Sequence, residues 1–105
     1  MDNLIEEIEE WAAKRGLDKA DSSKQLLKLQ EELGELTQGH LKKNGGQVED
    51  SIGDLFVVLT IYCLQRNISL QGCVGEAYDT INNRTGKMIN GVFVKTEDLQ
   101  DTDKK

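Results

Sequence analysis

The sequence has few of the residues from which disulfide frameworks, zinc sites and nucleic-acid-binding surfaces are built. It contains two cysteines and one histidine in 105 residues, and its 13 basic and 19 acidic residues give a formal net charge of -6. Cys63 and Cys73 lack C-x-x-C spacing, so we expect two packed, reduced thiols. The negative charge argues against binding of a nucleic-acid polymer, which requires a basic surface.

Long hydrophobic runs are also missing. No basic-then-apolar leader opens the chain, and its longest apolar run is too short to span a bilayer. We therefore expect a cytoplasmic protein with no membrane partner. A chain of 105 residues forms one domain, and its single core would leave much apolar surface exposed in a monomer. This size favours a homo-oligomer.

The periodicity of the apolar residues predicts four helices. The first is capped by Asp2 or Asn3 and stops near Gly16, and the second is capped by Ser22 or Ser23. The third spans about residues 47–65, and the fourth is capped by Ser69 and reaches Asn82 or Asn83. The predicted packing residues of the second helix are Leu26, Leu29, Leu33 and Leu36, and those of the fourth are Cys73, Val74, Ala77, Tyr78 and Ile81.

The segments between and after these helices predict turns. Asn44-Gly45-Gly46 is expected to connect the second and third helices and to return the chain antiparallel. The third helix is apolar on nearly every side, so a second subunit is expected to cover part of it. Residues 88–94 predict a short hairpin around Asn90-Gly91. Residues 96–105 are polar and charged, which predicts a disordered tail after a domain of residues 1–95.

Several carboxylates are spaced so that they would meet between the second and third helices. Glu32 lies at the edge of the leucine stripe, Glu35 lies a little further round, and Glu31 lies on nearly the opposite side. On the third helix, Asp50 and Asp54 share a face. Crowded carboxylates resist ionising together unless a cation lies among them, and Mg²⁺ prefers oxygen ligands. The pattern predicts a magnesium site made by Glu32, Glu35, Asp50 and Asp54.

Two motifs carry this pattern, Glu31-Glu32-Leu33-Gly34-Glu35 and Asp50-Ser51-Ile52-Gly53-Asp54. In these motifs, in the spacer between them and in residues 83–95, the chain resembles the MazG-like all-α nucleotide pyrophosphohydrolases, particularly small phage and bacterial members. The resemblance covers about residues 4–95. It departs at Ser51, where the family's E-x-x-D motif has Glu, so only Asp54 carries over directly from that motif. Asp50 is the carboxylate that would replace the missing one, and the number of bound ions stays open.

The resemblance implies both a fold and an activity. The implied fold is an all-α, four-helix MazG-like bundle that forms homodimers or homotetramers and ends in a short hairpin-like extension. The implied activity cleaves a nucleoside triphosphate to a monophosphate and pyrophosphate, and it requires magnesium or manganese. The residues assigned to this activity are Glu31, Glu32, Glu35 and Asp54 as catalytic groups, and Lys28, Arg84 and Lys87 as phosphate-binding groups.

Two alternatives to this activity stay open. A non-catalytic helical assembly module of the same fold would carry the acids as surface groups, and Ser51 favours that alternative. A phosphoribosyl-ATP pyrophosphohydrolase shares the chemistry and differs in its substrate. The aromatic residues Trp11 and Tyr78 are expected in the core, with stacking on a nucleobase as the alternative role.

Overall fold

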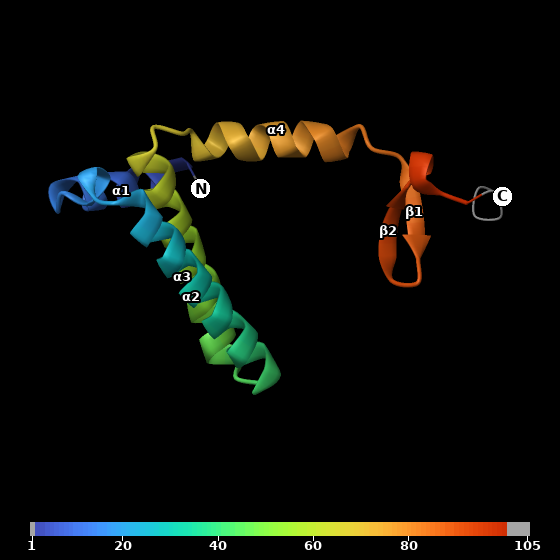
Figure 1. Ribbon diagram of the computed structural model, residues 1–105, viewed down its shortest axis with the longest axis horizontal. Coiled ribbons are helices and arrows are strands. Elements are labelled where there is room, and N and C mark those ends of the chain that lie inside the picture. The colour runs from blue at the N-terminus through green and yellow to red at the C-terminus, as the bar shows by residue number, and fades with distance from the viewer. Residues whose placement is uncertain (1, 101–105) are drawn as a thin grey trace. The chain divides into compact units, whose positions relative to one another are not determined.

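The computed structural model describes residues 2–100, and these divide into two compact units, Met1–Gln71 and Gly72–Lys105. The described residues form four α-helices and one two-stranded antiparallel sheet, so the expectation of a mainly helical chain with a C-terminal hairpin is confirmed (Figure 1). No helix among the described residues is long and apolar enough to cross a membrane.

Helix α1, Asp2–Lys14, opens the N-terminal unit and ends where the sequence predicts. Gly16 follows it with a φ of 74°, a left-handed conformation that glycine adopts without steric cost. A short 3₁₀ helix, η1, then covers Leu17–Lys19, where a loop was expected. Ala12 is fully buried, and α1 packs on α3 through this side.

Helices α2, Ser22–Leu41, and α3, Gly45–Gln65, lie side by side as an antiparallel hairpin (Figure 1). Asp21 caps α2 by accepting a hydrogen bond from Ser23 N at 2.9 Å. Asn44 caps α3 in the same way, with its Oδ1 accepting from Gln47 N at 3.1 Å. Both caps use the short polar side chains that favour this position.

These two caps correct the sequence interpretation of the helix starts. Asp21 caps α2, and the expected caps Ser22 and Ser23 lie inside the helix. The turn before α3 is shorter than expected, because Gly45 and Gly46 already form the first turn of α3. The chain reverses instead at Lys43, a non-glycine residue with a φ of 57°. The side-chain cap of Asn44 therefore fixes the start of α3, which does not depend on the conformational freedom of Gly45 and Gly46.

The stripe of α2 that faces α3 runs through every third or fourth residue and includes Gln25, Leu29, Glu32, Leu36 and Gly39. Gln25 Nε2 donates to Val58 O at 3.1 Å near one end of the pair. Near the other end, Gln47 Nε2 donates to Glu35 O at 2.9 Å. These two bonds fix the register of the hairpin.

The predicted leucine stripe of α2 is therefore wrong in half of its members. Leu29 and Leu36 are half-buried against α3, whereas Leu26 and Leu33 are exposed. Leu29 and Leu36 are seven residues apart and lie on one line along the helix, which contacts α3. Leu26 and Leu33 lie on a second line beside it, which does not.

The core of the N-terminal unit lies along α3. Its buried residues are Ser51, Val58, Thr60, Ile61 and Cys63, together with Ala12 of α1, Gly39 of α2 and Leu70. Gln65 Nε2 donates to Leu17 O at 2.9 Å and so ties η1 to the end of α3. The remaining apolar residues of α3 are half-buried or exposed, in line with the expectation that its own chain does not cover it completely.

The C-terminal unit contains most of α4, Leu70–Asn82, and a hairpin of β1, Gly86–Ile89, and β2, Val92–Lys95. Ile89 pairs with Val92, and the two turn residues Asn90 and Gly91 have φ values of 51° and 80°. Positive φ at both central residues is the signature of a type I′ turn, so the Asn-Gly prediction is confirmed.

Two expectations for the C-terminal unit are not met. The predicted buried side of α4 is exposed in the structure, and its members are Cys73, Val74, Ala77, Tyr78 and Ile81. Thr96–Asp98 forms a short 3₁₀ helix, η2, where composition predicts disorder, and Thr96 N donates to Thr85 O at 2.8 Å. The remainder of the predicted tail, residues 101–105, lies outside the described residues.

Candidate functional site

Glu32 is the carboxylate that the fold brings between α2 and α3. It belongs to the α2 stripe that faces α3, between Leu29 and Leu36, and it is half-buried. Its Oε2 atom is buried and has no hydrogen-bond partner among the described residues. A buried carboxylate oxygen without a partner is unfavourable, because that atom has lost its hydrogen bonds to water and has no protein donor in their place.

The pKa of the Glu32 carboxyl is raised above its usual value. Burial is the largest cause, since it disfavours the charged form. The negative charges of Glu35 and Asp54 raise the pKa further, as does a hydrogen bond with Glu35, while the charge of Lys28 lowers it. Because Asp54 lies on α3, carboxylates of both helices contribute to the raised pKa of Glu32.

We call the residues that determine this pKa the acid face, which consists of Glu32 and Glu35 of α2, Asp54 of α3 and the neighbouring Lys28. Glu35 and Asp54 are exposed at the surface around the half-buried Glu32. In the part of the chain that the structure describes, no three His, Cys, Asp or Glu side chains are gathered in an arrangement that could hold a metal ion. The acids thus interact electrostatically, but they do not form a preformed metal site.

The other two predicted acids lie further out. Glu31 and Asp50 are both exposed. Glu31 lies about 100° round α2 from Glu32, and Asp50 precedes Asp54 by one helical turn. Both flank the acid face, and Glu31 shares its exposure with Glu35 of the same motif.

Ser51 is the residue at which the resemblance described above departs from the E-x-x-D motif, and its burial shows which side of α3 it occupies. Ser51 is only 3% exposed. It lies on the same side of α3 as Val58, the residue whose carbonyl accepts from Gln25 of α2. Position 51 therefore lies on a buried side of α3, where this chain has a small hydroxyl side chain.

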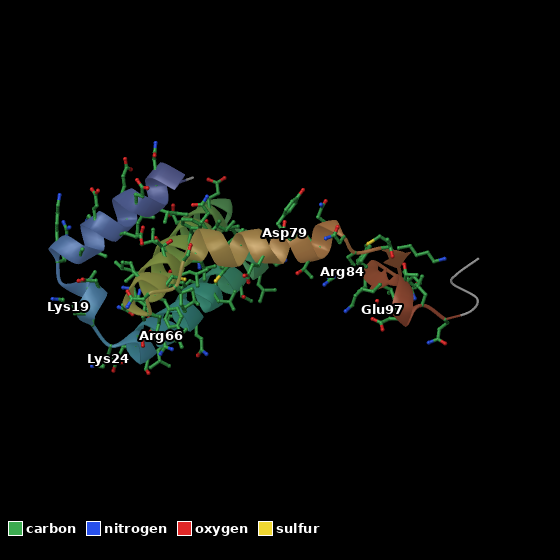
Figure 2. The ribbon with its side chains drawn as sticks, turned by 90° about the horizontal axis from the view of Figure 1, so that it is seen from above. Lys19, Lys24, Arg66, Asp79, Arg84 and Glu97 are labelled. Atoms are coloured by element: carbon green, nitrogen blue, oxygen red, sulfur yellow. The ribbon has the colours of Figure 1, made fainter. Side chains whose placement is uncertain are left out.

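The predicted phosphate-binding residues fall into two groups. Lys28 lies one turn before Glu32 and lowers the pKa of its carboxyl, so it belongs to the acid face. Arg84, labelled in Figure 2, follows the end of α4 and is exposed. Lys87, on β1, is also an exposed residue of the C-terminal unit. These two residues therefore belong to a different unit from the acid face.

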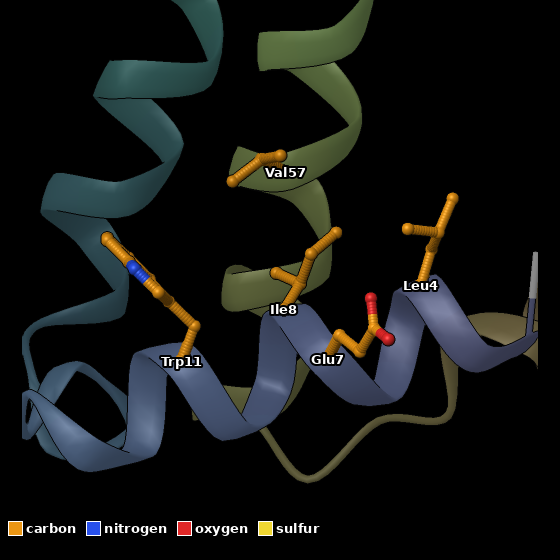
Figure 3. Close-up of a pocket in the computed structure, with 5 residues that line it drawn as sticks. All are labelled: Leu4, Glu7, Ile8, Trp11 and Val57. Carbon is orange, nitrogen blue, oxygen red and sulfur yellow. The ribbon is translucent and has the colours of Figure 1, made fainter.

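An apolar pocket of about 300 Å³ lies between α1 and α3 (Figure 3). Leu4, Ile8 and Trp11 rise from α1, Val57 faces them from α3, and Glu7 completes the lining. The expectation that Trp11 is a core residue is wrong, because the side chain is 47% exposed at this pocket.

A contact within α1 accompanies the surface position of Trp11, which the sequence interpretation placed in the core. Arg15, one turn later, places its Cζ 4.1 Å from the centre of the Trp11 ring and donates from Nη1 to Trp11 O at 3.0 Å. The spacing Trp-x-x-x-Arg was the available signal, because an i, i+4 cation over an indole holds the ring at the surface.

No known family profile matches the chain, and no solved structure matches it. Among curated proteins, the one named "Uncharacterized 18.2 kDa protein in rep-hol intergenic region", from Haemophilus phage HP1 (strain HP1c1), is 44% identical over 69 residues. The match covers 65% of this chain and 42% of the phage protein, so the chain spans less than half the length of that relative. A similar sequence thus occurs in a bacteriophage, and the activity is inferred below from this chain's own residues.

Proposed function

We propose that this protein is a metal-dependent nucleoside triphosphate pyrophosphohydrolase of the MazG-like all-α type. The reaction cleaves the bond between the α- and β-phosphates and releases a nucleoside monophosphate and pyrophosphate. One observation carries the proposal: the carboxyl of Glu32 is half-buried, is crowded by Glu35 and Asp54, and has an oxygen without a partner. This arrangement is unfavourable in the protein alone and becomes favourable when a cation is added.

The acid face fits magnesium or manganese by its chemistry. All of its acidic donors are carboxylate oxygens, which hard divalent ions prefer, and Glu35 and Asp54 are exposed and free to adjust. The proposed ligands are Glu32, Glu35 and Asp54, with Asp50 in place of the carboxylate that Ser51 lacks. A bound divalent ion would supply charge stabilisation to the phosphoryl oxygens and a more acidic water.

The remaining residues of the proposed site act on the water and the phosphates. Glu31 is exposed beside Glu32, and we propose that its carboxylate accepts a proton from the attacking water. Lys28 lies on the acid face and pairs with a phosphate oxygen. Arg84 and Lys87 belong to the C-terminal unit, and their proposed phosphate-binding role rests on their exposed positive charge alone, for which the guanidinium of Arg84 offers two parallel donors.

We assign the nucleobase to the apolar pocket between α1 and α3. Its volume of about 300 Å³ is at the lower limit for small-molecule sites, which suits a single ring system. The Trp11 ring offers a planar, exposed surface for stacking. Val57 in the pocket follows Asp54 by three residues on the same helix, so the pocket and the acid face are neighbours along α3.

A non-catalytic assembly module of the same fold is the second candidate. It is favoured by the buried Ser51 and by the absence, among the described residues, of three gathered metal-binding side chains. In that case the acids would keep the protein soluble, and a metal would bind weakly or without turnover. Both candidates include self-association as a homodimer or homotetramer.

Incubation with a panel of canonical and modified nucleoside triphosphates, with Mg²⁺ or Mn²⁺, tests the proposal. The panel should include phosphoribosyl-ATP, since that substrate would identify the related activity. We expect pyrophosphate and a monophosphate as products, and orthophosphate would indicate a different cleavage. The matched variants are Asp54→Asn, which removes a proposed ligand, and Glu49→Gln, which neutralises an exposed acid elsewhere on α3. If no substrate is cleaved with either ion, the proposed hydrolysis is contradicted and the non-catalytic assembly module is the remaining candidate.

A further inference from the structure

Two Asn-Gly pairs occur in the chain, Asn44-Gly45 and Asn90-Gly91. In an Asn-Gly pair the backbone nitrogen of the glycine can attack the carboxamide of the asparagine, because glycine has no Cβ to hinder the close approach. This reaction needs no enzyme. The local structure around each pair therefore decides which of them reacts.

Asn90 and Gly91 are the two central residues of the turn that joins β1 and β2, and both are exposed. The Asn90 side chain makes no hydrogen bond with any described residue, and neither does the backbone N–H of Gly91. The electrophilic carbon and the attacking nitrogen are therefore both accessible to solvent, and no bond has to be broken to release either of them.

The turn also opens at low cost. Ring closure requires rotation about the backbone of Asn90, which takes this residue out of the type I′ conformation. β1 and β2 contain four residues each and form the one sheet of the described residues, and an isolated two-stranded hairpin is marginally stable. Its apolar side chains add little, since Met88, Val92 and Phe93 are 62%, 63% and 46% exposed. Local opening of this hairpin should therefore be frequent.

Asn44-Gly45 contains the same two residues in a protected setting. Asn44 Oδ1 accepts from Gln47 N at 3.1 Å, and Asn44 N donates to Gly39 O at 2.9 Å. Gly45 already belongs to α3, whose first turns pack closely on Gly39 of α2. An attack by Gly45 N would require the Asn44 carboxamide to leave its capping position and the junction of the two helices to open.

We propose that Asn90 is a site of spontaneous deamidation and that the fold selects it over Asn44. The Gly91 nitrogen forms a bond to Cγ of Asn90, and the bond from Cγ to Nδ2 breaks. The proton of the Gly91 N–H leaves with Nδ2, so ammonia is released and a cyclic imide remains. One water molecule then opens the imide at either of its carbonyl groups. Nothing is oxidised or reduced, and the solvent supplies the only co-reactant.

The two products differ in their effect on the hairpin. Hydrolysis at one carbonyl gives aspartate at position 90, and because Asp-Gly also favours a type I′ turn, this product adds a negative charge and keeps the strands paired. Hydrolysis at the other gives isoaspartate, in which the side-chain methylene has become part of the backbone. This additional backbone atom lengthens the two-residue loop and disturbs the pairing of Ile89 with Val92.

The inference does not rest on hydrolysis of a nucleotide, since an inactive protein would deamidate equally well. The test is incubation of the full-length protein without nucleotide or metal, at neutral and at mildly alkaline pH. Mass spectrometry of protease fragments measures deamidation at each Asn-Gly pair in the same sample. An isoaspartate-specific carboxyl methyltransferase labels the isoaspartate product.

We expect deamidation at Asn90 to be at least about tenfold faster than at Asn44, which corresponds to about 1.4 kcal/mol of protection, little more than the loss of one helix cap. In concentrated urea the two sites should react at similar rates, because the fold no longer distinguishes them. Equal rates in the folded protein would overturn the proposal. So would a folded protein that modifies neither site under conditions in which the urea-unfolded chain modifies both.

The matched variants are Asn90→Gln and Asn44→Gln, since glutamine has one more methylene and does not form the five-membered ring. Methyltransferase labelling of the incubated protein should fall at least about tenfold in Asn90→Gln and stay unchanged in Asn44→Gln. Circular dichroism checks that both variants keep their helices. Labelling that persists in Asn90→Gln would assign the modification to another residue and contradict the proposal.

Discussion

The acid face differs in almost every physical property from the opposite side of α2, the neutral face, which consists of Leu26, Gln30, Leu33 and Thr37. The acid face gathers Glu32, Glu35 and Asp54 around a half-buried carboxyl whose pKa is raised. The neutral face exposes Leu26 and Leu33 and contains no Lys or Glu. Charge is thus segregated across α2, with its lysines and glutamates on one side and uncharged residues on the other.

This comparison also explains the composition of α2. Its lysines and glutamates lie on one side of the helix, and leucine, glutamine and threonine occupy the opposite side. The stripe between the two sides, which contains Leu29 and Leu36, packs on α3. Each side of the helix can therefore be changed with little direct effect on the other, and the predictions below use this separation.

The largest expected effect is on hydrolysis by the acid face. Under the proposed function, Glu35→Gln and Asp54→Asn each remove a ligand charge and should lower kcat/KM by at least about 100-fold, measured by pyrophosphate release. The helix content of both variants in circular dichroism should equal that of the wild type. Unchanged activity in both variants would contradict the assignment, and a loss of helix would show that the change is not confined to the acid face.

A change between the faces should weaken the whole hairpin. A Cβ at Gly39 would lie 3.0 Å from Gln47 Cγ and 3.2 Å from Val48 N, closer than ordinary packing. Gly39→Val should therefore lower the free energy of unfolding by about 1–3 kcal/mol in urea denaturation. Gly34→Val is the matched control, because Gly34 is exposed and nothing lies within 4 Å of its Cβ position. If both variants lose the same free energy of unfolding, the cause is the low helix propensity of valine and not the close contact at Gly39.

The start of α3 should contribute a smaller amount. Asn44 Oδ1 accepts from Gln47 N at 3.1 Å, and the loss of such a cap costs about 1 kcal/mol. Asn44→Ala should lower the free energy of unfolding by that amount, whereas Asn44→Asp, which keeps the acceptor, should not. A cap lies beyond both faces, so the activity per folded molecule should not change.

The smallest expected effect is a pH dependence that comes from Glu32. Because the folded state raises the pKa of this carboxyl, its protonated form favours folding; that contribution is complete below the unfolded pKa and is lost as the pH rises through the folded pKa. Glu32→Gln cannot ionise. Without divalent ions, its stability relative to wild type should increase between about pH 4 and about pH 7.5 in urea denaturation.

Added Mg²⁺ sharpens this pH experiment. If the acid face binds the ion, Mg²⁺ should stabilise the wild type at the higher pH and narrow its difference from Glu32→Gln. A stability difference that does not depend on pH would contradict the raised pKa. A pH-dependent difference that Mg²⁺ leaves unchanged would support the pKa and contradict the metal site.

Local signals in the sequence predicted the extents of the helices and the turn of the hairpin well. Asn90-Gly91 supports a turn with two positive φ values, and Gly16 ends α1, because both effects depend on the backbone of one or two residues. The Asn44-Gly45-Gly46 turn was placed too late, since a cap and a flexible turn use the same residue types.

The sequence by itself determined the helical periods, the hairpin and the lines of charge along α2, because these follow from residue order at about 100° per residue. Only the tertiary structure decided which line of leucines is covered, that Trp11 lies at a surface pocket, and that Asp54 acts on Glu32. The physical reason is that burial and electrostatic coupling depend on which side of α2 meets α3. That choice is fixed by contacts such as those of Gln25 and Gln47, between residues far apart in the chain.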